Sequence, residues 1–201
     1  MMFMYDEKLK VAYEKSNEII KLLSYDDNDM ISTQDVINIV EKHYCPSIIV
    51  QSTSFSKIGI SEGYGAMMST VLDDTGCKPI KATIVLNSDN DEKFQRFSLM
   101  HEIGHLITRA WDKEDIQRTD ANTQFIVSTH IDYNITNIPE KLYKNSVYLT
   151  NEQIANIFAL RVLMPSEQFF EKMKQKKISL EVAKFFGLTE DAVISRMMIG
   201  A

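Results

Sequence analysis

The stretch FSLMHEIGHLI, residues 97–107, places two histidines four residues apart, with a glutamate directly after the first. Residues four apart lie on one face of a helix, so His101 and His105 can point at the same ion. Neutral imidazoles are common zinc ligands, and a carboxylate beside them can act as a general base on water. The spacing therefore predicts a zinc site with His101 and His105 as ligands and Glu102 as the catalytic base.

A third ligand is needed, because catalytic zinc usually takes three protein ligands and one water. One extension of the motif adds a third histidine in the pattern H-E-x-x-H-x-x-G-x-x-H. Thr108 and Trp111 occupy the glycine and last histidine positions here, which excludes that class. A second extension takes a glutamate from a later helix, and Glu152 is the candidate. Asp112 and Glu114, just past the first helix, are weaker alternatives.

The segment LTNEQIANIFALRVLMP, residues 149–165, has the pattern of that later helix, with Thr150 and Gln153 as a capping-box pair. Glu152 lies in the first turn, where the helix dipole alone favours a carboxylate without any metal. The rest of the helix is apolar, and a carboxylate buried beside it needs a partner, so we expect Glu152 to bind the zinc ion. Asn156, four residues later on the same face, is placed to hydrogen-bond the far nitrogen of a ligand histidine.

Beyond these two helices, the sequence predicts an α+β fold. Short β-branched runs bounded by turn residues indicate strands at residues 47–55, 65–72 and 80–88. Periodic apolar positions indicate helices at residues 5–24 and 33–43, the second capped by Thr33. We expect a small antiparallel or mixed sheet packed on the histidine-bearing helix. Gly104 costs that helix about 1 kcal/mol relative to alanine, so another element is expected to approach it closely.

Length, charge and cysteine content indicate how many domains the chain forms and which classes of protein are excluded. A chain of 201 residues that is 44% hydrophobic predicts one domain. We divide it into N-terminal helices (1–45), a catalytic core (46–165) and a C-terminal helical segment (166–201). The net charge of −6 argues against a general nucleic-acid surface. The charged start and the absence of a long apolar run argue against a secretory signal and a membrane span. Cys45 and Cys77 lack metal-ligand spacing, so we expect buried thiols and a cytoplasmic protein.

The C-terminal stretch SLEVAKFFGLTEDAVISRM, residues 179–197, has the spacing of a helix-turn-helix, with Gly187 at the turn. DNA binding would require contacts from the start of the second helix. Glu190 and Asp191 occupy that start, and their carboxylates repel phosphate. We therefore expect a packing or protein-contact role for this segment, and no direct binding of nucleic acid.

Two blocks of the chain, RFSLMHEIGHLI and NEQIANIFALRVLMP, resemble the signature blocks of the ImmA/IrrE family of zinc metallo-endopeptidases. Those blocks typically read R-F-T-x-A-H-E-x-G-H-x-x and E-x-x-A-N-x-F-A-x-x-L-L-M-P, and the resemblance spans roughly residues 46–197. The residues shared outside the histidine motif and Glu152 include Arg96, Phe97, Gly104, Ala155, Phe158, Ala159, Leu163, Met164 and Pro165. One departure is the stretch 112–148, which is longer than is usual in the family.

The resemblance implies a zincin-like fold of the gluzincin kind, with Zn²⁺ held by His101, His105 and Glu152 and with Glu102 as the base. It further implies a cytoplasmic endopeptidase of restricted specificity. Such proteins commonly cleave a helix-turn-helix transcriptional repressor of a mobile element or a stress response. Two alternatives stay open: a catalytically silent regulatory protein of the same fold that acts by contact, and a DNA-binding regulator.

The substrate side of the site is predicted from less specific features. The strand at residues 82–88 offers an edge on which an extended peptide could align. Stabilisation of the oxyanion requires a further hydrogen-bond donor. His130, Tyr133 and Tyr148 are candidates. Each is more often a structural or surface residue, and that interpretation is favoured for all three.

Overall fold

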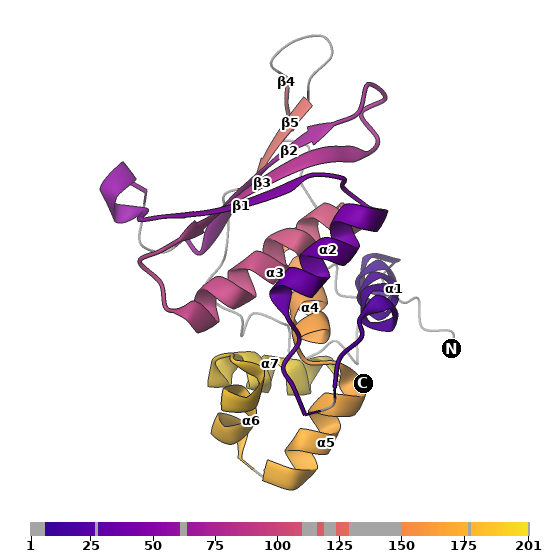
Figure 1. Cartoon of the computed structure of the whole chain (residues 1–201), viewed down its shortest axis with the longest axis vertical. Coiled ribbons are helices and arrows are strands. Elements are labelled where there is room, and N and C mark those ends of the chain that lie inside the picture. Colours follow the sequence, from indigo (N-terminus) through magenta and orange to yellow (C-terminus); the bar gives the residue numbers. More distant parts are fainter. Residues whose placement is uncertain are drawn as a thin grey trace.

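A computed structural model describes residues 7–26, 28–60, 64–109, 116–118, 124–128, 150–176 and 178–200. The helices are α1 (Glu7–Leu22), α2 (Thr33–His43), the 3-10 helix η1 (Ser56–Ile58), α3 (Glu92–Thr108), α4 (Asn151–Leu163), α5 (Ser166–Lys176), α6 (Ser179–Phe186) and α7 (Glu190–Ile199). The strands are β1 (Ile48–Thr53), β2 (Ala66–Leu72), β3 (Pro79–Asn87), β4 (Ile116–Arg118) and β5 (Gln124–Ser128). Figure 1 shows the sheet at one end, α1 to α4 in the middle and α5 to α7 at the other end.

The strands form one five-stranded sheet in the order β1-β3-β2-β5-β4. β1 runs parallel to β3, and the remaining neighbours are antiparallel, so the sheet is mixed. β3 lies between β1 and β2 and is hydrogen-bonded on both sides. The prediction that residues 82–88 form an open edge is therefore wrong. A strand paired on both sides cannot receive a peptide, because its backbone groups are already satisfied.

The sheet packs on α3, the helix that carries the two histidines (Figure 1). Alternate residues of β2 and β3 are buried, as the period of two in a strand requires when one face covers a helix. The buried positions include Met68, Ile84 and Leu86. Every residue of α3 from Phe97 to Ile107 is buried, because the sheet covers one side of the helix and α4 lies against another. The predicted α+β fold with a small mixed sheet on this helix is confirmed.

Two N-terminal helices flank the α3–α4 pair (Figure 1). The cap of α2 is Ser32, whose hydroxyl accepts from the backbone N–H of Asp35, so the expectation of Thr33 as the cap was wrong by one residue. α1 is joined to α4 by Arg161, which is almost fully buried. Its guanidinium donates to Ser16 Oγ and Asn17 Oδ1, both at 3.1 Å. It also lies 3.9 Å from the centre of the Tyr13 ring.

The C-terminal helices α5, α6 and α7 follow directly from the end of α4. Gly187 ends α6 in the left-handed conformation, with φ of 63°, and so makes the turn that the helix-turn-helix spacing predicts. The fully buried Arg196 of α7 donates to the carbonyl of Met164 and to Ser166 Oγ. These bonds join the segment to the end of α4. The division of the chain into three parts of a single domain stays a prediction.

Two further expectations concern the chain as a whole. No helix among the described residues is both long enough and apolar enough to cross a membrane. Cys45 is buried, as expected, whereas Cys77 is exposed in the turn between β2 and β3, so the expectation of two buried thiols was wrong for Cys77.

Candidate metal centre

The centre is built where α3 and α4 cross. A Cβ atom added at Gly104 would lie 2.9 Å from the carbonyl oxygen of Ala155 and 3.1 Å from its Cα atom. Since real Cβ atoms do not approach backbone atoms this closely, only glycine allows the two helices to come so near. The expected reason for Gly104 is therefore confirmed. The close approach brings the side chains of α3 and of the first turns of α4 within reach of each other.

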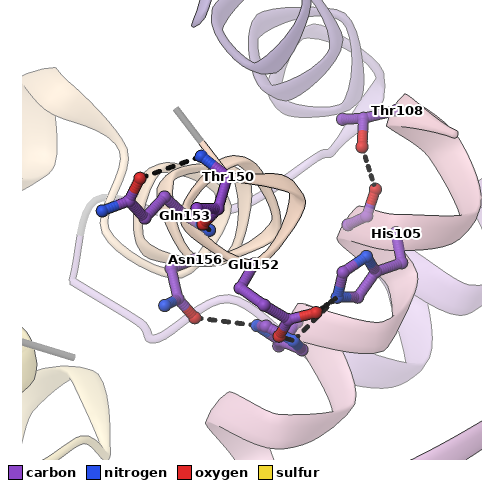
Figure 2. Close-up of polar contacts among 8 residues, drawn as sticks. His105, Thr108, Thr150, Glu152, Gln153 and Asn156 are labelled. Atoms are coloured by element: carbon purple, nitrogen blue, oxygen red, sulfur yellow. Dashed lines mark hydrogen bonds and ion pairs between the residues drawn. The ribbon is translucent and has the colours of Figure 1, made fainter. Parts of the chain in front are cut away.

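The start of α4 is fixed by the predicted capping box, which Figure 2 shows. Gln153 N–H donates to Thr150 Oγ1 at 3.2 Å, and Thr150 N–H donates to Gln153 Oε1 at 2.9 Å. These two bonds satisfy backbone N–H groups that no backbone carbonyl of the helix can pair. They hold the first turn of α4 in place, and that turn carries Glu152.

Glu152 faces His105, as Figure 2 shows, and also contacts His101. Its Oε2 atom lies 3.1 Å from His101 Nε2, and its Oε1 atom lies 3.2 Å from His105 Nε2. The two Nε2 atoms lie 2.9 Å apart. Both imidazoles are buried, whereas the Glu152 side chain keeps 29% of its surface exposed. The three residues form a group whose ligand atoms all lie within 4.8 Å of one another.

Asn156 fixes the orientation of one imidazole. Its Oδ1 atom lies 2.7 Å from His101 Nδ1, and both groups are buried. Because an amide oxygen can only accept, we assign the His101 proton to Nδ1. Burial lowers the pKa of His101, and the Glu152 carboxylate only partly opposes this effect, so the ring is neutral at ordinary pH. The Nε2 atom of His101 then has a lone pair that points toward Glu152.

The centre thus gathers three electron-pair donors at about 3 Å from one another. Burial raises the pKa of Glu152, but the neighbouring imidazoles of His101 and His105 lower it by more, to about 2, so this carboxylate is ionised. Within the described part of the chain, Glu152 Oε2 has no hydrogen bond, although His101 Nε2 lies 3.1 Å away. The neutral ring of His101 has a single N–H, at Nδ1, and Asn156 accepts it. His101 Nε2 therefore has no proton to donate, and we interpret its contact with Glu152 Oε2 as one between two lone pairs. Such an arrangement is unfavourable without a cation.

The distances and donor types suit a transition-metal ion. Ligand atoms at zinc–nitrogen and zinc–oxygen lengths of about 2.1 Å stand roughly 3.4 Å apart in a tetrahedral site. The separations of 2.9, 3.1 and 3.2 Å are close to that value. Two imidazoles and a carboxylate are also a ligand set of catalytic zinc sites, in which the fourth position stays open. His101, His105 and Glu152 therefore fit the ion that the sequence predicts.

Glu102 lies next to this group in the sequence and is fully buried. Neither carboxylate oxygen has a hydrogen-bond partner among the residues that the structure describes. Burial raises the pKa of Glu102 to about 8, and the nearby Glu152 carboxylate adds to this effect against the influence of His105. A buried carboxyl group without a partner lowers stability, and such groups are found mainly where chemistry uses them.

Five candidates lie outside the described residues: Asp112, Glu114, His130, Tyr133 and Tyr148. Their proposed roles, as other ligands or as donors to an oxyanion, stay predictions. Sequence reasoning missed the part that Arg161 plays in holding α4 against α1. The signal was present, since Arg161 is the one charged residue in the apolar part of α4.

Comparison with known proteins agrees with this geometry. The sequence profile of the IrrE N-terminal-like domain, which describes a family of metallopeptidase type, matches residues 60–198. The match covers more than half of the chain and includes α3 and α4 with all the residues of the centre. No curated protein matches the chain significantly. The chain belongs to the IrrE N-terminal-like domain family.

Proposed function

We propose that the chain is a zinc-dependent endopeptidase of restricted specificity. The observation that carries this proposal is the buried carboxylate of Glu102, which has no hydrogen-bond partner among the described residues and directly follows the metal-ligand candidate His101 in the sequence. A protein that acted only by contact would gain nothing from an unpaired acid in its core. A hydrolase needs a carboxylate at that position.

In this proposal His101, His105 and Glu152 hold the zinc ion, and Asn156 keeps His101 in the tautomer that offers Nε2. A zinc ion bound in this way would make water more acidic and would polarise a peptide carbonyl. The ionised state of Glu152 and the neutral state of His101 are the states that metal ligands require.

Glu102 is the proposed general base. Its carboxylate would take a proton from the attacking water and then deliver that proton to the nitrogen of the leaving amine. Burial raises the pKa of Glu102 in the metal-free chain, and a bound zinc ion would lower it toward the working pH, where a base works best.

We further propose that the substrate is a helix-turn-helix transcriptional repressor of a mobile element or a stress response, cut in the cytoplasm. Membership of a peptidase family supports a protein substrate. The choice of a repressor rests on the resemblance of the two sequence blocks to ImmA/IrrE proteins. The rival function is regulation by contact alone, without cleavage.

The Glu102→Gln variant separates the two functions, because glutamine keeps the size of the side chain but cannot take the proton. The variant and the native chain are each produced in cells together with a candidate helix-turn-helix repressor and a reporter that this repressor controls. We expect Glu102→Gln to retain zinc and repressor binding and to leave the repressor uncut and the reporter silent. Glu92→Gln is the matched control, since Glu92 is an exposed glutamate in the first turn of the same helix.

Reporter activation by Glu102→Gln with an uncut repressor would reject the peptidase proposal in favour of contact alone. Cleavage at the native rate by this variant would remove Glu102 from the role of base.

A further inference from the structure

The outer face of α7 carries an uncovered stripe of side chains. Asp191, Ile194 and Met197 recur every three residues and therefore lie along one side of the helix. All three are exposed, Ile194 to 38% and Met197 to 52%. The opposite side of α7 is buried against the rest of the fold. The stripe is therefore no part of the core, and its apolar members face solvent.

The start of α6 extends this surface. Ser179 Oγ is hydrogen-bonded to the Glu190 carboxylate, which sets the first residue of α6 beside the first residue of α7. The neighbours of Ser179 in the chain, Ile178 and Leu180, are exposed to 52% and 47%. Two more large apolar side chains thus lie at the acidic end of the stripe. We call Ile178, Leu180, Glu190, Asp191, Ile194 and Met197 the outer surface of the helix-turn-helix.

This surface has the position, but not the chemistry, of a DNA-binding face. In a helix-turn-helix that binds DNA, the start of the second helix meets the bases and the first helix crosses the phosphates. Here that start carries the carboxylates of Glu190 and Asp191, and the exposed residues Ile178 and Leu180 at the start of the first helix are apolar. Lys184 is an exposed base on α6, but Glu181 on the same helix offsets its charge. Phosphate would be repelled.

Apolar side chains flanked by carboxylates suit a protein helix of complementary character. Exposed apolar groups gathered on one face mark contact surfaces, and a stripe at helical spacing packs best against another helix. The carboxylates at one end require basic groups opposite them. We propose that the outer surface of the helix-turn-helix docks an amphipathic, basic helix of a partner protein. This proposal does not depend on peptidase activity.

The test uses the full chain and a labelled synthetic peptide of about 15 residues, a length at which a helix is marginally stable before it binds. Leucines occupy the first and fourth positions of each heptad, and lysines fill the remaining positions. A second peptide has glutamate in place of every lysine, and a duplex DNA serves as the third probe. Binding is measured by fluorescence anisotropy at physiological salt, and the oligomeric state of the chain is measured by sedimentation.

Two substitutions together, Ile194→Ser and Met197→Ser, remove the apolar stripe without changing the charge. We expect them to weaken binding of the lysine peptide by at least about tenfold. Ile58→Ser is the matched control, because Ile58 is 54% exposed on η1, near the sheet and far from α7, and should leave binding unchanged (Figure 1). Asp191→Asn should weaken binding and reduce its dependence on salt. This variant changes one exposed side chain and keeps both apolar members of the stripe, so it tests the surface even if the double variant folds poorly.

Four results would overturn the proposal. The native chain fails to bind the lysine peptide, or the double variant binds it as tightly as the native chain does. The glutamate peptide binds equally well, so that charge has no part. The surface binds a different occupant. This occupant would be DNA if the native chain binds the duplex and the substitutions weaken that binding, and a second copy of the chain if the native chain self-associates and the double variant does not.

Discussion

Gly104 of α3 lies against the backbone of Ala155 of α4, with no room for a methyl group between them. The two helices carry different ligands of the candidate metal centre, so this contact sets the distance between the histidines and Glu152. Gly104→Ala would gain about 1 kcal/mol of helix propensity but would force the helices apart, at about 1–3 kcal/mol for overpacking. We expect lower thermal stability and weaker zinc binding, measured by unfolding and by titration against a chelator. Unchanged values for both would show that the helices can separate freely.

Much of the centre could be predicted because its signals are local. The spacing of His101 and His105 places both on one helical face whatever the rest of the fold does. The capping pair of Thr150 and Gln153 marks the start of α4 within a few residues of sequence. Once the start of α4 is known, Glu152 can be chosen as the ligand, because it is the one residue of the first turn with a carboxylate.

The features that could not be predicted depend on contacts between distant residues. Nothing in the composition of residues 80–88 tells whether β3 lies at the edge of the sheet or between β1 and β2, because the pattern of a strand fixes its faces and not its neighbours. Ser32 and Thr33 can both cap a helix, and only the backbone conformation decides between them. The anchoring of Arg161 by Ser16 links residues 145 positions apart.

Asn156 should act on the metal through His101. Asn156→Ala removes the acceptor for the Nδ1 proton, so the ring is free to turn or to change tautomer. We expect zinc affinity to fall about 10-fold to 100-fold while the fold is kept. Asn156→Asp restores an acceptor oxygen and should recover most of the affinity. Equal zinc affinity in the alanine variant and the native chain would leave Asn156 with no part in holding the ligand.

Glu152 should be required for the metal and not merely for its helix. The native chain is expected to hold about one zinc per chain, and Glu152→Ala is expected to lose most of it under the same conditions. Elemental analysis after gel filtration gives the stoichiometry. Glu167→Ala is the matched control, because Glu167 is an exposed carboxylate in the first turn of α5 and has the same relation to its helix dipole. Similar zinc content in Glu152→Ala and the control would mean that the dipole alone accounts for Glu152.

The buried carboxyl of Glu102 should make the metal-free chain sensitive to pH. In the folded chain its pKa is about 8, against an ordinary value of 4.5. The folded state therefore binds this proton more tightly than the unfolded state, and stability falls as pH rises from 4.5 toward 8. Below pH 4.5 the group is protonated in both the folded and the unfolded state, so it no longer changes the free energy of unfolding with pH. Above pH 8 the group is ionised in both states, and the free energy of unfolding falls no further on its account.

Glu102→Gln isolates this effect, because glutamine has the same shape and no proton to lose. The free energy of unfolding of both metal-free proteins is measured with urea across this range of pH. We expect the two to be similar near pH 4.5 and the variant to become steadily more stable than the native chain toward pH 8. A constant difference across the range would mean that Glu102 is ionised throughout in the folded chain. A neighbouring group would then have to stabilise that charge, although no described residue forms a hydrogen bond with either oxygen.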